Sequence, residues 1–148
     1  MGFFDAIDVA ASGLTAERLR MDVTAENLAN AQTTRSATGG PYQRQEVVLE
    51  QAGGFGVTLQ SAMGGGVASG AIASGVQVAG IVADQTPDRL VYDPGHPDAN
   101  AQGYVRMPNV NPVTEMVDLI SESRSYEADV TAMQTAKSMY AKTLDLLK

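Results

Sequence analysis

The chain has 148 residues, of which 44% are hydrophobic and 5% aromatic, which is enough for one ordinary core. Its 17 acidic residues outweigh 10 basic ones, and the net charge of -7 argues against a nucleic-acid binder because phosphates require a basic face. The absence of cysteine excludes disulfides and thiolate chemistry, but it suits a cytosolic and an exported protein equally.

Residues 3–30 carry the periodicity of a long amphipathic helix. Large apolar residues recur every seven positions at Ile7, Leu14, Met21 and Leu28. A second set of small apolar residues, Val9, Ala16 and Val23, lies roughly 200° further round the helix axis. Apolar residues on two sides indicate that more than one neighbour packs here, although a helix buried in a monomeric bundle would show the same pattern.

Residues 31–111 predict a linker followed by a small β-rich insert. Residues 31–41 are polar and rich in turn formers, and the alternation in residues 42–49 predicts a first strand. Residues 76–82 predict a second strand and residues 90–92 a third. Because 11 of the 15 glycines fall between Gly39 and Gly80, much of that stretch is expected to be loop.

Two features bear on membranes and export. Residues 51–83 contain no charged side chain, but they contain too much Gly, Ser and Gln for a hydrocarbon core, so we expect no membrane insertion. The N-terminus has no basic region followed by a long apolar core and a cleavage site, so we expect no cleaved signal peptide.

Residues 112–147 predict a second, longer helix. Asn111 is a favourable cap, and Pro112 suits the first helical turn. One apolar stripe runs along this helix, with residues repeated every seven positions and others three or four positions away from them. It is formed by Met116, Leu119, Tyr126, Val130, Met133, Tyr140, Leu144 and Leu147. At about 1.5 Å per residue this rod is roughly 50 Å long. We expect coiled-coil-like packing against this chain and neighbouring chains; an ordinary core helix of a bundle is the alternative.

Side chains suited to catalysis or metal binding are scarce. The single histidine, His96, has no cysteine or second histidine to complete a zinc site, so we expect it to be solvated or to fix its loop. Asp118 and Glu122 lie four residues apart on the predicted helix, where a solvated face is favoured over an acid–base pair. We therefore expect no catalytic residue, no metal ion and no cofactor, and an enzyme is the least favoured class.

The expected fold class is α+β. The two terminal helices have matching seven-residue periods, and we expect them to pair as an antiparallel coiled-coil-like layer. This predicts one helical domain formed by residues 1–30 and 112–148, with residues 31–111 as the linker and small β-rich insert between its halves.

Two stretches carry a resemblance to a known family. Residues 11–34, ASGLTAERLRMDVTAENLANAQTT, resemble the N-terminal signature of bacterial flagellar rod and hook axial proteins. The core of that match is Asn27, Leu28, Ala29 and Asn30. Residues 89–130, beginning RLVYDPGHPDANAQGYVRMPNVNP, resemble the proximal rod subunits of the same family.

The resemblance implies a non-enzymatic building block of the flagellar rod. Its partners would be copies of itself and other rod proteins, together with the flagellar type III export apparatus and the membrane ring at the rod base. Such a subunit would lie in the basal body, across the periplasmic space, in a helical assembly whose inner layer is formed by the terminal helices. A coiled-coil adapter or secreted assembly protein that forms closed oligomers is the alternative.

The asparagines of the signature have an expected role of their own. Asn27 and Asn30 lie where the apolar period stops, and Asn tolerates left-handed dihedrals and binds backbone groups with its side chain. We expect them to end the first helix and to set the direction in which the chain leaves it.

Overall fold

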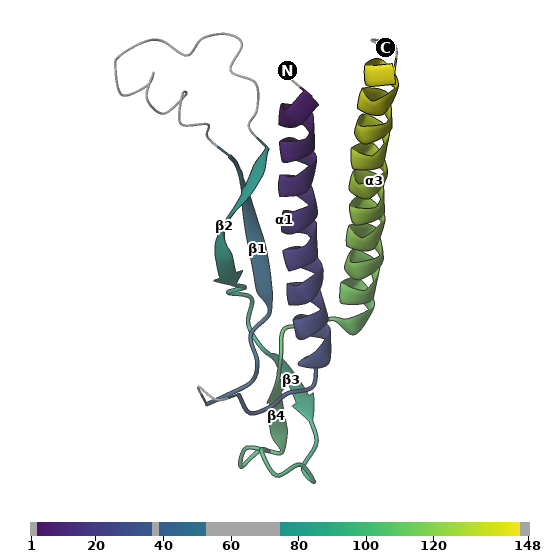
Figure 1. Ribbon diagram of the computed structural model, residues 1–148. Coiled ribbons are helices and arrows are strands. Elements are labelled where there is room, and N and C mark those ends of the chain that lie inside the picture. Colours follow the sequence, from purple (N-terminus) through teal and green to yellow (C-terminus); the bar gives the residue numbers. More distant parts are fainter. Residues whose placement is uncertain (1–2, 37–38, 53–74, 146–148) are drawn as a thin grey trace, which may run out of the picture. The chain divides into compact units, whose positions relative to one another are not determined.

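The computed structural model describes residues 3–36, 39–52 and 75–145, and the side chains from residue 7 onward. In chain order, the described residues form one long helix, four short strands and a second long helix (Figure 1). The elements are α1 (Phe3–Ala29), β1 (Gln45–Gln51), β2 (Val76–Ala83), β3 (Arg89–Tyr92), β4 (Tyr104–Met107) and α3 (Pro112–Asp145). Helices at both ends with small sheets between them confirm the expected α+β class.

The chain divides into two compact units, each with parts of both helices and of the strands. The first unit contains the described parts of residues 1–18, 49–79 and 123–148, and the second those of residues 19–48 and 80–122. The predicted division into a helical domain and an insert stays a prediction. Most of the glycine-rich stretch expected to be loop falls in residues 53–74, outside the described residues.

The ends of the helices follow from local chemistry. Asn111 caps α3, because its side-chain oxygen accepts a hydrogen bond from the Val113 N–H at 3.1 Å. Pro112 is the first residue of α3, where its missing N–H costs nothing. At the other end α3 is described to Asp145, so Leu147 lies outside the described residues. None of the described helices is both long and apolar enough to cross a membrane.

The strands form two separate two-stranded sheets, β1 with β2 and β3 with β4. The second sheet is an antiparallel hairpin in which Val91 is opposite Val105 and Tyr92 is opposite Tyr104. Val105 is completely buried, whereas Tyr92 is exposed, so one face of the hairpin packs inward and the other is open to solvent. The predicted strands correspond to β1, β2 and β3, and β4 was not anticipated.

The core of the second unit is small and partly polar. Its buried apolar residues are Val23, Ala31, Val105, Pro108 and Val110. Four polar or charged residues are equally buried, namely Thr24, Asn27, Glu115 and Glu122. The two glutamates are the buried residues of α3, so polar bonding has a large share in holding this unit together.

Candidate functional site: a buried polar cluster and an exposed helix face

The side-chain amide of Asn27 connects α1 to Tyr42 and to Gln45, the first residue of β1. Asn27 is 1% exposed, and its side-chain oxygen accepts hydrogen bonds from the Gln45 N–H and the Tyr42 hydroxyl, both at 2.9 Å. Its side-chain nitrogen donates to the Gln45 carbonyl at 2.8 Å and to Glu115 Oε2 at 3.3 Å. Because it binds both backbone groups of Gln45, Asn27 holds the returning chain as a neighbouring strand would.

Glu115 and Arg44 form the charged half of the same cluster. Glu115 is 1% exposed, and Arg44 Nε donates to its Oε1 at 2.6 Å. The remaining guanidinium nitrogens lie 3.9 Å from carboxylate oxygens of Glu46, Asp84 and Asp118. The hydrogen bond to Glu115 is the main reason why the pKa of Arg44 is raised. A buried carboxylate is thereby matched by a cation and by a neutral amide.

The backbone of Arg44 is fixed as firmly as its side chain. Its N–H donates to Asn109 Oδ1 at 2.9 Å, and its carbonyl accepts the Asp84 N–H at 2.8 Å. The Asn109 side-chain nitrogen in turn donates to the Thr86 carbonyl at 3.3 Å. Arg44 therefore joins the chain entering β1 to the segments that follow β2 and β4.

Glu122 forms a second polar contact between the helices, and its burial corrects the expectation of a solvated acidic face. It is 4% exposed, and its Oε1 accepts the Thr24 hydroxyl at 3.2 Å and lies 3.6 Å from Arg20 Nε. Asp118, the other acid of that pair, keeps a 42% exposed side chain. The solvated reading therefore fails for Glu122, which faces α1.

The structure separates the roles of the two motif asparagines. α1 ends at Ala29, and the Asn30 side-chain nitrogen donates to the Glu26 carbonyl at 3.0 Å while its oxygen accepts the Thr33 hydroxyl at 3.1 Å. No non-glycine residue in the described ranges has a positive φ, so Asn30 does not use the left-handed conformation expected of it. Asn27 lies inside α1, two residues before its end, and its amide binds Gln45. That the two asparagines set the direction in which the chain leaves α1 stays a prediction.

Ser12 and Gly13 also belong to residues 11–34, the stretch that resembles the family signature, and each makes a contact within the first unit. Ser12 Oγ donates to the Val9 carbonyl at 2.7 Å and accepts the Val76 N–H at 3.1 Å, which fixes the start of β2. A Cβ at Gly13 would lie 3.0 Å from an oxygen of Asp129, so glycine allows α3 to approach closely in the first unit.

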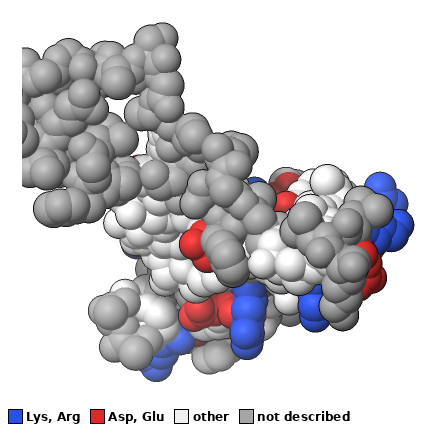
Figure 2. All heavy atoms as spheres, turned by 45° about the horizontal axis from the view of Figure 1, so that its top comes forward, with Lys and Arg blue, Asp and Glu red and all other residues white. Residues whose placement is uncertain are grey.

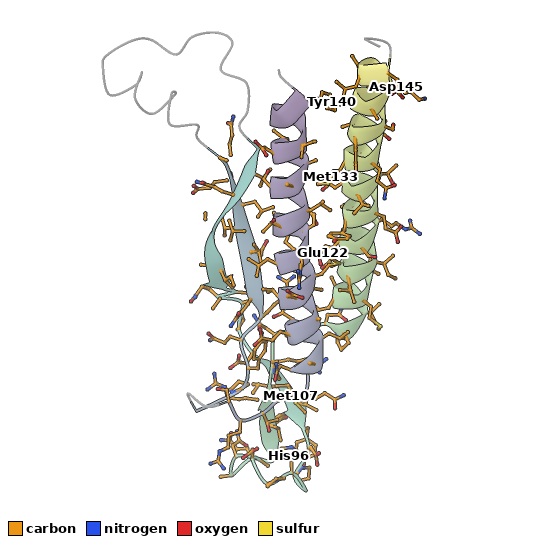
Figure 3. All side chains as sticks on the ribbon, viewed as in Figure 1. His96, Met107, Glu122, Met133, Tyr140 and Asp145 are labelled. Carbon is orange, nitrogen blue, oxygen red and sulfur yellow. The ribbon has the colours of Figure 1, made fainter. Side chains whose placement is uncertain are left out.

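The predicted packing residues differ in exposure. Most are half-buried, namely Ile7, Leu14, Met21, Leu28, Leu119, Tyr126, Val130 and Met133. Met116, Tyr140 and Leu144 are exposed, and Leu147 lies outside the described residues. Figure 3 labels Met133, Glu122 and Tyr140 on α3. The assembly role of these residues stays a prediction.

The first turns of α3 present an apolar stripe that the sequence reading missed. Val113, Met116, Val117 and Ile120 follow the i, i+3, i+4, i+7 spacing of one helix face and are 46% to 66% exposed. We refer to these four residues as the α3 stripe. Only Met116 was anticipated, because the other three lie outside the seven-residue period used to find the packing face.

The remaining candidate, His96, has a structural contact. His96 lies in the loop between β3 and β4 (Figure 3), where its Nδ1 accepts the Asp98 N–H at 3.1 Å, so it fixes that loop. The described residues contain no group of three or more His, Cys, Asp or Glu suited to a metal ion. In the view of Figure 2, acidic and basic side chains lie next to one another.

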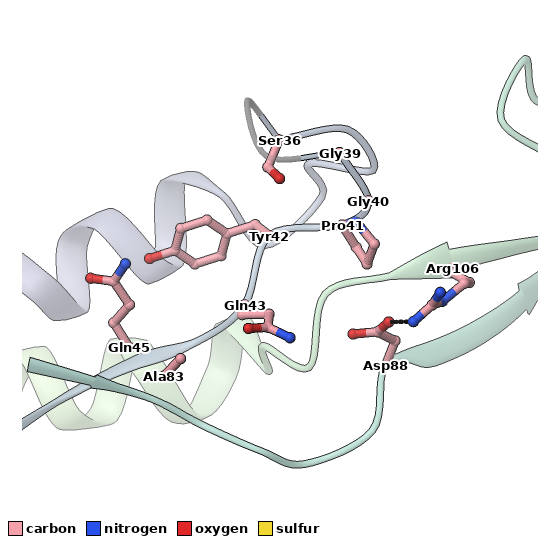
Figure 4. A pocket seen from close by; sticks show the side chains of 10 residues that line it. All are labelled: Ser36, Gly39, Gly40, Pro41, Tyr42, Gln43, Gln45, Ala83, Asp88 and Arg106. Carbon is pink, nitrogen blue, oxygen red and sulfur yellow. Dashed lines mark hydrogen bonds and ion pairs between the residues drawn. The ribbon is translucent and has the colours of Figure 1, made fainter.

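One polar cleft of about 460 Å³ lies in the second unit (Figure 4). The acid and the cation among its lining residues, Asp88 and Arg106, form an ion pair with each other. Tyr42 lines the same cleft, and its pKa is raised, first by burial and then by the charges of Glu26 and Glu115. A neutral phenol and a compensated ion pair fit a structural role.

Comparison with known proteins gives first the class and then the family. The family model "Flagella basal body rod protein" matches residues 7–35, and "Flagellar basal body rod FlgEFG protein C-terminal" matches residues 101–146. The matched segments include Asn27, Glu115, Glu122 and the α3 stripe. The two matches place the chain among flagellar basal-body rod proteins.

Relatives that match along the whole chain identify the family within the class of flagellar basal-body rod proteins. The chain is 49% identical over 153 residues to the flagellar basal-body rod protein FlgC of Bacillus subtilis (strain 168), with 100% of both chains covered. It is 44% identical to FlgC of Borreliella burgdorferi, covering 100% of this chain and 99% of the relative, and 44% identical to FlgC of Escherichia coli O6:H1, covering 99% and 98%. The chain belongs to the FlgC family of flagellar basal-body rod proteins, which confirms the resemblance noted in its sequence.

Proposed function

We propose that this chain is a structural, non-catalytic subunit of the flagellar basal-body rod that assembles with copies of itself and other rod proteins into a helical shaft. The α3 stripe is the observation that supports assembly most directly. Its four large apolar residues are 46% to 66% exposed in the single chain. A contiguous apolar stripe on a surface helix is a feature of protein contact sites, because water is released when a partner covers it.

The pairing of the terminal helices as an antiparallel coiled-coil-like layer is part of this proposal. Within the second unit, Asn27 of α1 contacts Glu115 and Thr24 contacts Glu122. The order along one helix is reversed along the other, which supports antiparallel packing. The half-buried residues with seven-residue spacing would form the apolar side of the layer.

Further partners and the location rest on family membership alone. The flagellar type III export apparatus would deliver the chain without a cleaved signal peptide, and the membrane ring would meet it at the rod base. The assembled position would be the basal body, across the periplasmic space. A coiled-coil adapter that forms closed oligomers is the competing function.

The α3 stripe provides a direct test. Val117→Asp and Ile120→Asp should each prevent incorporation into rods and abolish swimming, because a charge would have to be buried in the contact. The free energy of unfolding of the isolated chain should change by less than about 0.5 kcal/mol, since both side chains are more than half exposed. Thr114→Asp, on an exposed neighbouring position of α3, is the matched control and should leave swimming intact.

Solution mass distinguishes the two functions. A rod subunit should remain a monomer in dilute solution or form open-ended assemblies that grow with concentration. Sedimentation of the purified chain as a discrete dimer or trimer, with normal swimming of the Val117→Asp strain, would favour the closed adapter.

A further inference from the structure

The β3–β4 hairpin of the second unit has an exposed face with large apolar side chains. Its strand register and the alternation of side chains place Leu90, Tyr92, Tyr104 and Arg106 on the face opposite to the buried Val105. Leu90 is 62% exposed, Tyr92 65% and Tyr104 43%. We call Leu90, Tyr92, Tyr104 and Arg106 the hairpin patch.

The ring of Tyr92 is held in place although most of it is exposed. Its centroid lies 5.3 Å from that of Tyr104 across the hairpin, in an edge-to-face arrangement. Gly103, with φ at +82°, leaves room for the ring, since a Cβ at this position would lie 2.9 Å from a carbon of Tyr92. An exposed aromatic side chain that is already positioned loses little conformational entropy on binding, which suits a contact with another protein.

Stabilisation of the hairpin explains only part of this surface. A cross-strand aromatic pair stabilises the two strands that carry it, and this accounts for Tyr92 and Tyr104. It does not account for Leu90, which lies opposite Arg106 and is 62% exposed. The hairpin patch therefore presents more apolar surface than its own strands require.

The α3 stripe is a second exposed apolar surface of the same unit, and it shares no residue with the hairpin patch. The charges next to the two surfaces have opposite signs. Arg106 has a 69% exposed side chain and its acid Asp88 only 10%, so the hairpin patch presents a cation. Asp118, which follows Val117 of the α3 stripe, has a 42% exposed side chain. Each charge is paired within the chain, so the two would orient a contact more than strengthen it.

A helical shaft built from copies of one chain needs a contact between two different surfaces. A surface that binds itself closes after two copies, whereas a contact between two unlike surfaces leaves one of each free at the ends and lets the assembly grow. The second unit has two such surfaces, both apolar and with opposite charges beside them.

We propose that the hairpin patch of one copy of this chain docks on the α3 stripe of the next copy. The proposal rests on the proposed function, which assigns the α3 stripe to assembly, and it names the surface that covers the stripe. Leu90 and Tyr92 supply the apolar area of the hairpin side, and Val117 and Ile120 that of the helix side.

Two variants each remove one of the two surfaces. Leu90→Asp places a carboxylate opposite Arg106 across the hairpin, a favourable cross-strand pair, so the hairpin should still fold. Ile120→Asp changes a position of the α3 stripe that is 56% exposed. Each variant alone should self-associate at least about tenfold more weakly than the unsubstituted chain, because a charge would be buried in the contact. Sedimentation of the purified full-length chains measures this, and circular dichroism checks that they fold.

The decisive measurement is an equimolar mixture of the two variants. The intact α3 stripe of the Leu90→Asp chain can bind the intact hairpin patch of the Ile120→Asp chain, and no third copy can add to this pair. The mixture should therefore form complexes of one copy of each and nothing larger, with the affinity of the unsubstituted contact. Gln102→Asp, at an exposed turn position outside the hairpin patch, is the matched control and should associate as the unsubstituted chain does.

Three results would overturn the proposal. The mixture could remain as light as the separate variants, or Leu90→Asp alone could associate as strongly as the unsubstituted chain. The third result is an unsubstituted chain that stays monomeric up to about 1 mM, which would show that a second copy does not cover the α3 stripe. Swimming of the Ile120→Asp strain tests the rod function separately. If Leu90→Asp does not fold, Leu90→Ser makes the same comparison.

Discussion

Asn27→Ala removes only a small side chain, but it should strongly lower the free energy of unfolding. The amide makes four hydrogen bonds and is 1% exposed, so the substitution leaves both Gln45 backbone groups, the Tyr42 hydroxyl and one Glu115 oxygen short of a partner. Each lost bond contributes about 0.5–1.5 kcal/mol, and each buried group left unpaired costs about 1–3 kcal/mol. Since water and small shifts will recover part of this, we expect a loss of about 3–5 kcal/mol.

The neighbouring motif asparagine is the matched control. Asn30 donates one side-chain hydrogen bond and accepts another, and it is only half-buried, so Asn30→Ala should cost about 1 kcal/mol. Urea unfolding followed by circular dichroism measures both variants, with the denaturant slope checked for constancy. If Asn27→Ala unfolds within about 0.5 kcal/mol of Asn30→Ala, the cluster does not stabilise the second unit as described.

Three further substitutions have defined outcomes. The pKa of Tyr42 is raised from 10.0, so its contribution to the free energy of unfolding is complete below the unfolded pKa and is lost as the pH rises through the folded pKa. In urea unfolding above about pH 10, Tyr42→Phe should therefore lose less stability with rising pH than the unsubstituted chain does. The pKa of Asp84 is lowered from 3.8 by hydrogen bonds, so its contribution is lost as the pH falls through the lowered value, and Asp84→Asn should lose less stability below about pH 4. Gly75→Ala should cost about 2 kcal/mol in a thermal melt, because φ is +98° and the added Cβ would lie 2.3 Å from Ser12 Oγ; Gly39→Ala, where φ is +81° and nothing lies within 4 Å, should cost less.

The elements that could be predicted are those with a strong period or a clear cap. α3 could be predicted because Asn111 and Pro112 mark its start and no glycine or proline follows. Alternation predicted β1 and β2, and a short run of strand-forming residues, 90–92, predicted β3. β4 has only four residues and follows a turn in which Asn100 accepts the Tyr104 N–H, so its pattern is hidden by turn-forming neighbours.

The polar cluster could not be predicted in the same way. Arg44 and Glu115 are 71 positions apart, and nothing local to either residue indicates the other. A partial signal existed, because Glu115 and Glu122 share the seven-residue spacing of the apolar stripe and therefore one side of α3. Acids near the start of a helix are also stabilised by the helix dipole when they are exposed, so their spacing alone does not indicate burial.

The two buried residues of α3 are both glutamates, while its first turns carry four exposed apolar side chains. A surface helix usually buries apolar residues and exposes charged ones, and in α3 this arrangement is partly reversed. Folding and association should therefore respond differently to temperature and to salt. Cooling weakens apolar contacts, and salts such as sulfate strengthen them, whereas a buried carboxylate bound to a guanidinium is little affected by either. Contacts made through the α3 stripe should therefore loosen in the cold and tighten in sulfate while the second unit keeps its fold, so that assembly can be reversed without unfolding the subunit.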